Sequence, residues 1–445
     1  MRLMLAKTGA SAAFAIALAI TCTGYTFAST HSPASAGTGA LGASAAGTVP
    51  PAQSPPAARS LPSPACTTAT APSADLKGVR TAKVSLPAAP FGVATAGGWA
   101  FVAVADGVEV LRTGRSLAPA AVRTIRVAGG PAGLAITPNG RYLLAAVGSG
   151  AVVISVARAE RGAAGAVRGT LSAPSRDPSA GSAIEAAVSP DGQFAFVTLE
   201  YADTAVVFNL GKALSKGFRA ADYVGSVPLG QAAVGMAVSP GGRWLYATSE
   251  VALPSRASSE GQRGRPYATS ELVQPTAAVP QHGTLTVIDL RRAETHPASS
   301  VVATVDAGCQ PVRVITSADG SEVWVTARAS DDLLCFSAAR LASDPAHALV
   351  AVVRVGEAPV GLAAVRGGSL IVVADSNRFD ARGAIADLDV VNVAAALSGR
   401  RAVVGHIASG SFPREMALLP NGTLLVSDYA SSQVEAVDVA TIPGR

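Results

Sequence analysis

The sequence predicts an all-β fold, a seven-bladed β-propeller with four antiparallel strands in each blade. One pattern recurs seven times: a short apolar run, a polar turn that contains glycine, and a second apolar run, as in AIEAAVSPDGQFAFVTL from Ala183 and PVRVITSADGSEVWVTA from Pro311. Repeats of this kind, at intervals of ~40–50 residues, are typical of propeller blades. The turn glycines are Gly98, Gly140, Gly192, Gly242, Gly320, Gly368 and Gly422.

Two further strands are expected after each hairpin, because β-branched runs with period-two alternation follow it and polar turns separate them. Third-strand runs begin at Gly107, Ala151, Thr204, Thr284, Leu333, Ala386 and Gln433. Fourth-strand runs begin at Val122, Asp222, Val301, Ala348 and Ala402, and a weaker one lies within residues 166–172. The seventh repeat ends on its third strand and lacks an outer one.

A strand copy without a hairpin of its own, VRTAKVSL, precedes the first repeat at Val79–Leu86. We expect it to pair with the final run, Gln433–Val439, and to supply the outer strand of the seventh blade. This pairing would close the ring and protect an edge that otherwise invites aggregation.

The first residues have the pattern of an export signal. Arg2 and Lys7 precede an apolar stretch over residues 10–20, and Thr26-Phe27-Ala28 offers a small-x-small cleavage site. The apolar stretch is too short for a membrane span. We therefore expect a secreted, extracytoplasmic protein with no transmembrane domain in the mature chain. A lipid anchor on Cys22 is the alternative.

Three segments follow from this. Residues 1–28 are expected to be the signal peptide, and residues 29–74, rich in Ala, Ser and Pro, a disordered leader, because such a segment lacks the bulky apolar residues that offset ordering entropy. The propeller is expected over residues 75–445, interrupted by a polar insertion at residues 251–281. A long loop of this kind is either a functional lid or a disordered excursion.

Composition argues against nucleic acid as a partner. The formal net charge of +5 falls to +3 without the expected signal, which carries two basic residues and no acid, and the remaining charge is dispersed. With 49% hydrophobic and 15% charged residues, the chain can bury a large core, and we expect a monomer.

The repeat P-x-G-x-A-x-S-P-D/N-G-x-x-L/W-Y/L-V, followed by a third strand such as VIDL, resembles the YVTN-type repeats of YncE-like proteins over Val79–Asp438. Related seven-bladed propellers include bacterial lactonases of the 6-phosphogluconolactonase kind, and others are binding or surface proteins. The resemblance therefore implies a fold and leaves the activity open, because propellers host many unrelated functions.

The informative comparison lies between repeats at one position, seven residues before the turn glycine. Repeats two, four and six have glycine there, which lets backbones approach closely near the axis. Repeats three, five and seven have Glu185, Arg313 and Glu415 instead. Two interpretations stand. One is a polar pocket in which Arg313 recognises an anion and the carboxylates bind a cation or act as acid and base. The other is a structural ion-pair plug.

A second set of charged residues ends the second strands, on the face that carries the loops between strands two and three. These candidates for binding are Glu200, Glu250, Arg328, Asp375 and Asp428. Their oxygens could hold a divalent cation such as Ca²⁺ or Mg²⁺, although the sequence has no compact D-x-D-x-D-G loop, and acids at strand ends often serve turns. We therefore expect no cofactor, with a divalent cation as the alternative.

The four cysteines are assigned by strand position. Cys309 is placed at the start of the first strand of blade five and Cys335 in its third strand, about 9–10 Å apart across two strand spacings, which exceeds the reach of a disulfide. We expect both to be buried free thiols. The alternative is that Cys66 ties the leader to one of them.

Two functions from different classes are compatible with these features. The first is an exported, non-catalytic scaffold that binds a small molecule or an envelope protein. The second is a lactone hydrolase that uses Glu185 or Glu415 as base and Arg313 to stabilise an oxyanion. Since the sequence contains no H-E-x-x-H, G-x-S-x-G or P-loop motif, the scaffold is our main interpretation.

Overall fold

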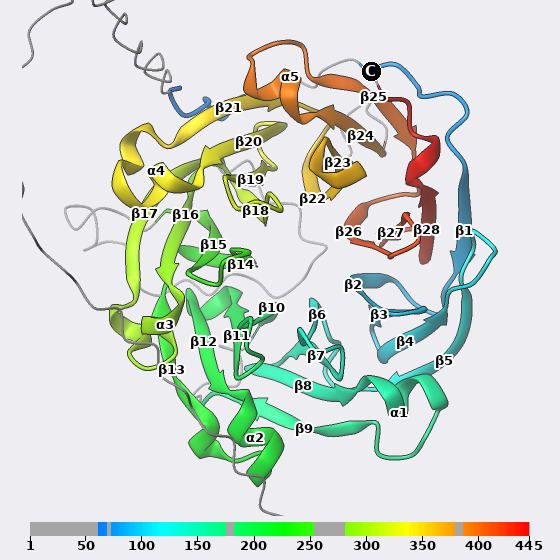
Figure 1. Cartoon of the computed structure of the whole chain (residues 1–445), viewed down its shortest axis with the longest axis vertical. Coiled ribbons are helices and arrows are strands. Elements are labelled where there is room, and N and C mark those ends of the chain that lie inside the picture. Colours follow the sequence, from blue (N-terminus) through cyan, green and yellow to red (C-terminus); the bar gives the residue numbers. More distant parts are fainter. Residues whose placement is uncertain (1–60, 69–72, 175–181, 253–280, 379–385, 445) are drawn as a thin grey trace, which may run out of the picture. The chain divides into compact units, whose positions relative to one another are not determined.

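The structure is a computed structural model, and it describes residues 61–68, 73–174, 182–252, 281–378 and 386–444. The expected signal peptide, Cys22, most of the leader and nearly all of the insertion lie outside these residues. Seven four-stranded antiparallel sheets form a ring of blades, with the first strand of each blade innermost (Figure 1). The predicted all-β, seven-bladed propeller is therefore confirmed.

The strands follow the repeat. Blade I holds β2 (Pro90–Ala96), β3 (Trp99–Val104), β4 (Gly107–Arg112) and β5 (Ala120–Arg126). Blade II holds β6 (Leu134–Ile136), β7 (Tyr142–Val147), β8 (Gly150–Ser155) and β9 (Val167–Ser172). Blade III holds β10 (Ala183–Val188), β11 (Phe194–Leu199), β12 (Thr204–Asn209) and β13 (Tyr223–Pro228). Blade IV holds β14 (Gln231–Val238), β15 (Trp244–Val251), β16 (His282–Asp289) and β17 (Val301–Cys309).

The last three blades complete the ring. Blade V holds β18 (Pro311–Thr316), β19 (Glu322–Ala327), β20 (Asp332–Ser337) and β21 (Leu349–Arg354). Blade VI holds β22 (Pro359–Val365), β23 (Leu370–Asp375), β24 (Asp387–Asn392) and β25 (Val403–Ala408). Blade VII holds β26 (Pro413–Leu418), β27 (Thr423–Asp428), β28 (Gln433–Asp438) and the N-terminal β1 (Thr81–Ser85).

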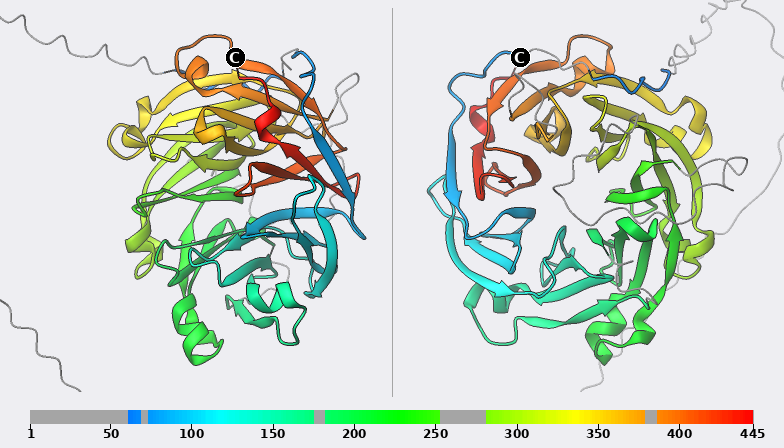
Figure 2. Two further views of the ribbon diagram at one scale, coloured as in Figure 1. Left: turned by 45° about the vertical axis from the view of Figure 1, so that its right-hand side comes forward. Right: turned by 180° about the vertical axis from the view of Figure 1, so that it is seen from behind.

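The predicted closure is present. β1 pairs antiparallel with β28 over five registered residue pairs, from Thr81 with Val437 to Ser85 with Gln433. The first and last strands of the ring lie side by side in both further views of the molecule (Figure 2).

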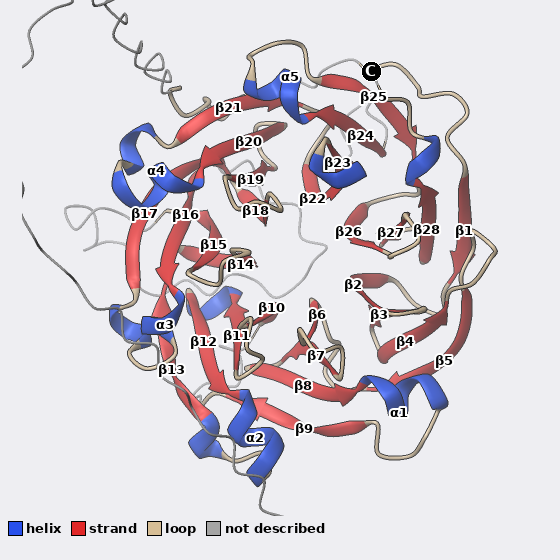
Figure 3. Cartoon of the chain, viewed as in Figure 1, coloured by secondary structure: helices blue, strands red, loops and turns tan. Residues whose placement is uncertain are grey.

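Short helices follow the third strands, between strands three and four on the outer side of the ring (Figure 3). They are α1 (Val156–Arg161), α2 (Leu210–Lys216), α3 (Leu290–Ala293), α4 (Ala338–Ser343) and α5 (Val393–Leu397), and the 3₁₀ turn η8 (Val439–Thr441) takes this place in blade VII. Other 3₁₀ turns are η2 (Glu200–Ala202), η3 (Ala220–Asp222), η5 (Pro297–Ser299), η6 (Pro345–His347) and η7 (Arg366–Gly368).

The last residue of each third strand that a helix follows is the N-cap of that helix, and it is a Ser, Asn or Asp. Asn209, Asp289 and Asn392 accept hydrogen bonds from the backbone N–H three residues on, at 2.8–2.9 Å. Side-chain oxygens of this kind satisfy amides at a helix start that have no partner within the helix. We read the Asp of VIDL only as part of a strand, so the sequence analysis missed these helices.

Apolar side chains fill the interfaces between neighbouring blades. Seven clusters of buried residues lie at the seven blade-to-blade contacts; the one between blades IV and V includes Tyr246, Leu285, Val323 and Phe336. Burial of this surface is the main stabilising contribution to the ring.

Hydroxyl groups join neighbouring inner strands near the axis. In blades III, IV, V and VII, a Thr or Ser on strand two accepts from the backbone N–H of its own first strand and donates to a carbonyl of the next blade's first strand. Thr326, for example, accepts from Arg313 N at 3.1 Å and donates to Val360 O at 2.7 Å. These bonds fix the backbone at the position that the charged residues occupy.

The strand position and the free thiol expected for Cys309 were wrong, and the alternative, a disulfide between Cys66 and one of the two cysteines, is present. Cys309 ends β17, the outer strand of blade IV, and forms a disulfide with Cys66. Because Cys309 therefore lies on the outer edge of the ring, it can reach the N-terminal segment. Cys335 is a buried free thiol, as predicted.

Residues 61–68 and 73–76, most of which we assigned to the leader, lie against outer strands. Leu61 N donates to Leu349 O, and Leu76 N donates to His406 O. The described part of the chain has no helix long and apolar enough to span a bilayer.

Candidate functional site

The three charged exceptions meet. Glu185, Arg313 and Glu415 stand on the innermost strands β10, β18 and β26 of blades III, V and VII. Arg313 Nε donates to Glu415 Oε1 at 2.5 Å, and its Nε lies 3.5 Å from Glu185 Oε2. We name these three residues the axial cluster. The sequence comparison predicted both the position and the meeting of these side chains.

Glycine in the intervening blades makes room for this arrangement. Arg313 contacts Glu185 two blades away in one direction and Glu415 two blades away in the other, while blades IV and VI contribute Gly235 and Gly361 at the same position. A Cβ at Gly361 would overlap the Arg414 carbonyl, and one at Gly235 would overlap that of Val312. The close backbone approach expected of glycine is therefore present.

Burial dominates the electrostatics of the axial cluster. The Arg313 side chain is 7% exposed, and those of Glu185 and Glu415 are 13% and 15% exposed. Burial raises the pKa of Glu185 to about 8, although Arg313 opposes the rise. Near neutral pH, Glu185 therefore holds a proton, and its carboxyl group lies beside the contact between Arg313 and Glu415.

A second ion pair lies on the same face, which we call the 2–3 face because it carries the loops between strands two and three. Arg328 donates to Glu250 Oε2 at 2.7 Å, and to Gln310 Oε1 at 3.3 Å. Burial, with Glu250 nearby, raises the pKa of Glu200 to about 7. Glu200, Glu250 and Arg328 are thus brought together around the axial cluster.

An arginine among aromatic rings completes the face. The guanidinium carbon of Arg414 lies 3.8 Å from the ring centroid of Phe91, 4.9 Å from that of Phe412 and 5.3 Å from that of Tyr429. Such contacts are attractive, and more so where water is excluded; Arg414 is 8% exposed. We missed this residue, although a signal was available: Arg414 stands where other repeats have aliphatic residues such as Val312.

Two predicted residues lie elsewhere, within their own blades. Asp428 is buried in blade VII, where Gln433 Nε2 and Ser409 Oγ donate to it at 2.8 and 3.1 Å. Asp375 is buried in blade VI beside Asp387 and Asp389.

Blade VI thus contains three neighbouring buried carboxyl groups that the sequence analysis did not bring together. Burial, with the neighbouring acids, raises the pKa of Asp375 well above its usual value. Burial also raises the pKa of Asp387 to about 6 and that of Asp389 to about 7.

Some acids of the 2–3 loops have a structural task. Asp203 and Asp331 adopt positive φ angles of 52° and 56°. Their carboxylates accept from the backbone N–H of Ala232, at the start of β14, and of Ala358, directly before β22, at 3.0 Å each. This agrees with the turn role that acids at strand ends often have.

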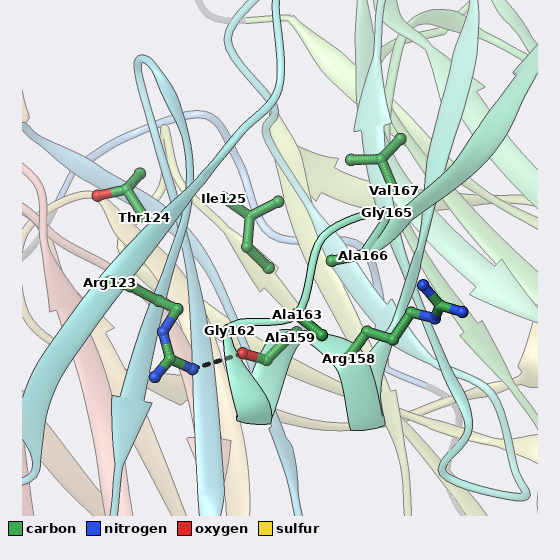
Figure 4. A pocket seen from close by; sticks show the side chains of 10 residues that line it. All are labelled: Arg123, Thr124, Ile125, Arg158, Ala159, Gly162, Ala163, Gly165, Ala166 and Val167. Carbon is green, nitrogen blue, oxygen red and sulfur yellow. Dashed lines mark hydrogen bonds between the residues drawn. The ribbon is translucent and has the colours of Figure 1, made fainter.

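The outer rim also has pockets, and one of about 300 Å³ lies between blades I and II (Figure 4). Arg123 on β5 lines it and donates to the carbonyls of Ala159 and Glu160 at the end of α1, at 2.7 Å each. The guanidinium is thus engaged with carbonyls at the helix terminus, and this pocket is part of the contact between two blades.

Comparisons with known proteins show the fold alone. No family model and no curated protein matches the sequence. Among solved structures, the chain is similar to hydrazine synthase of Kuenenia stuttgartiensis, with a TM-score of 0.56, 14% identity, and coverage of 82% of this chain and 99% of that chain. It is also similar to the β-propeller domain of Myceliophteria thermophila Cps50 (Swd1), with a TM-score of 0.56, 13% identity, and coverage of 81% and 100%.

Proposed function

We propose that this chain is a non-catalytic binding scaffold, exported to the cell envelope, that takes a charged ligand on the 2–3 face. The ligand is a polar small molecule or a segment of an envelope protein. The observation that carries the proposal is the axial cluster: three blades place a large charged side chain where the fold accepts glycine.

A gain in stability alone does not explain why charged residues replace glycine at this position. A buried ion pair contributes little net stability, because the desolvation of both charges offsets their attraction. The carboxylates are 13–15% exposed, and the Arg328–Glu250 pair and the aromatic rings around Arg414 lie on the same face. A ligand anion that exchanged with Glu415 would keep Arg313 paired, and aromatic rings supply apolar contact area.

The test is a thermal-shift screen of the mature chain against sugar phosphates, amino acids and short charged peptides. The comparison variant carries Glu185→Gly, Arg313→Gly and Glu415→Gly together, and Arg123→Ala on the outer rim is the control. A ligand of the 2–3 face raises the melting temperature of the wild type and of the control, and not that of the triple variant. A shift that the triple variant retains would place the site elsewhere.

Membership of the YncE-like group and export belong to the same proposal. Their support is the repeat PVRVITSADGSEVWVTA and its six counterparts, and the basic, apolar and small-residue pattern of residues 1–28. Mass spectrometry of the protein from its own cells tests export: we expect a mature chain that starts at Ser29, and an intact Met1 start in the cytosolic fraction would refute it.

One observation favours the lactone hydrolase as second candidate. A carboxyl group with a pKa of about 8, as for Glu185, can exchange a proton near neutral pH. Assays on a lactone panel, with and without divalent metal, separate the two functions. Turnover that Glu185→Gln abolishes would establish the enzyme and refute the non-catalytic scaffold.

A further inference from the structure

The three buried carboxyl groups of blade VI have oxygens without partners. Asp375 Oδ1, Asp387 Oδ1 and Asp389 Oδ2 accept no hydrogen bond from a backbone amide or a hydroxyl group of the described residues, although the three residues are 0%, 6% and 1% exposed. The carboxyl groups of Asp375 and Asp387 interact with each other. The ligand atoms of the three side chains lie within 4.8 Å of one another. Since an unpartnered buried carboxylate oxygen is costly, three that converge indicate something that they bind.

Strand register explains the convergence. Asp375 at the end of β23 is directly opposite Asp387 at the start of β24, and Asp389 is two residues further along β24. Residues two apart on a strand point to the same face. The other oxygens of the set are engaged, because Asp375 Oδ2 accepts from Asp389 N at 3.3 Å and Asp389 Oδ1 accepts from Ser73 Oγ at 2.9 Å.

The described protein groups supply little positive charge at this point. Within the described part of the chain, the ion pair that the set makes is between Asp387 Oδ2 and His406 Nδ1, at 3.8 Å. The raised pKa values of the three acids show that they resist ionisation in the absence of a cation. Once all three are ionised, even a protonated imidazole leaves two negative charges uncompensated. A divalent cation carries the charge that is missing.

At the same positions of blade VII, protein groups supply partners to every carboxylate oxygen except Glu435 Oε1. Asp428 and Glu435 occupy the positions of Asp375 and Asp389. There the position of Asp387 holds Gln433, which donates to Asp428 at 2.8 Å, and β1 brings Lys83 to 3.9 Å from Glu435. Blade VI instead has a third acid, and no Lys or Arg forms an ion pair with its three acids among the described residues.

We propose that Asp375, Asp387 and Asp389 form a binding site for a divalent cation inside blade VI, with Ca²⁺ as the favoured ion. Carboxylate oxygens are the ligands that Ca²⁺ and Mg²⁺ prefer, and three that lie within 4.8 Å of one another can bind one ion. Ca²⁺ is favoured because it accepts several protein carboxylates, whereas Mg²⁺ usually keeps several waters and is held by one or two carboxylates. This site is separate from the axial cluster and does not depend on the proposed function.

The site would also fasten the N-terminal segment. Ser73 Oγ lies 2.8 Å from His406 Nδ1 as well as contacting Asp389. His406 N donates to Ala74 O at 2.9 Å, and Leu76 N donates to His406 O at 2.8 Å. A cation that fixes the three carboxylates therefore orders the surroundings of residues 73–76 against β25.

The experiment starts from the mature chain after removal of metal with EDTA and dialysis. CaCl₂ and MgCl₂ are added separately at 1 mM, and the melting temperature, the binding isotherm and amide exchange at Leu76 and His406 are measured. We expect Ca²⁺ to bind at one site, to raise the melting temperature by roughly a few degrees and to slow exchange at both amides. If only Mg²⁺ has these effects, the site stands and the favoured ion is wrong.

Variants locate the site. Asp389→Asn should weaken binding at least about tenfold, since even partners outside the ligand shell affect affinity by that factor. The matched control, Asp428→Asn with Glu435→Gln in blade VII, should keep the wild-type affinity. Unchanged binding in Asp389→Asn would overturn the proposal. Wild-type protein that responds to neither ion would also overturn the proposal. This comparison does not require any variant to fold. The three acids would then be a cluster of protonated carboxyl groups.

Discussion

Removing Arg313 alone should destabilise the protein more than removing the whole axial cluster. Arg313→Gly leaves the Glu185 and Glu415 carboxyl groups buried without their cation. The triple variant, in which Glu185, Arg313 and Glu415 all become glycine, removes both the charges and the need to compensate them. Glycine is the residue that blades IV and VI carry at this position, so the backbone accepts it.

The structure sets the magnitudes. Arg313 is 7% exposed and contacts both carboxylates, and breaking a buried ion pair from one side costs about 3–5 kcal/mol. In the triple variant the main cost is backbone freedom, about 0.5–1 kcal/mol for each glycine in a strand, or about 1.5–3 kcal/mol in all. The difference should also depend on pH, because protonation of the carboxyl groups removes the charges that Arg313→Gly strands.

The assay is urea unfolding of the wild type and both variants at pH 8 and pH 5, followed by circular dichroism. We expect Arg313→Gly to be the least stable at pH 8 and to approach the triple variant at pH 5. Equal stability of the two variants at pH 8 would show that solvent screens the cluster, and our argument from burial would then be wrong.

Four further outcomes are expected. Deleting Val79–Leu86 removes five registered pairs between β1 and β28. With about one hydrogen bond for each pair, at about 0.5–1.5 kcal/mol for each bond, it should cost about 2.5–7.5 kcal/mol in urea unfolding. Because the deletion also shortens the link between the segment held by Cys66 and blade I, the comparison is made in a Cys66→Ser/Cys309→Ser background. That double variant alone should lower the melting temperature, since the disulfide closes a loop with a sequence separation of 243 residues, and an unchanged melt would contradict this. The pKa of Glu200 is raised to about 7 in the folded state. The contribution of Glu200 to stability is therefore present below pH ~4.5 and lost as pH rises through about 7. Glu200→Gln should be more stable than wild type at pH 8 and equal to it at pH 4.5. Asn392→Ala removes the cap of α5 and should cost about 1 kcal/mol in the same unfolding assay, whereas no loss would show that the cap is dispensable.

The strands, their grouping into blades and the ring closure could be predicted because the repeat encodes them locally. Each hairpin carries its own glycine turn, and counting strands leaves one gap at the end of the chain and one spare strand at its start. The axial cluster could be predicted for the same reason. Equivalent positions of a ring lie at the same height around one axis, so three exceptions at one position meet if their side chains are long enough, as those of Glu185, Arg313 and Glu415 are.

The Cys66–Cys309 disulfide could not be predicted from the repeat. Cys66 lies in a segment without periodicity, and its place depends on how residues 61–68 run along outer strands. Our error at Cys309 was one of strand assignment, because β17 continues to the residue that we placed at the start of the next blade. The helices after the third strands were within reach, since Asn209, Asp289 and Asn392 end those strands with capping side chains.

The acids of blade VI show what comparison at a single position leaves out. Asp375 is one of several acids at strand ends, and on its own it resembles the turn-forming Asp203 and Asp331. It differs from them only when the register of β23 with β24 brings Asp387 and Asp389 beside it. An unusual residue near the axis is found by comparing the same position in all blades. A group of unusual residues within one blade is found only by pairing the strands of that blade. In this chain, aligning the blades finds the axial cluster, in which Arg313 contacts both carboxyl groups. Pairing the strands of blade VI finds Asp375, Asp387 and Asp389, which have carboxylate oxygens that no described protein donor satisfies.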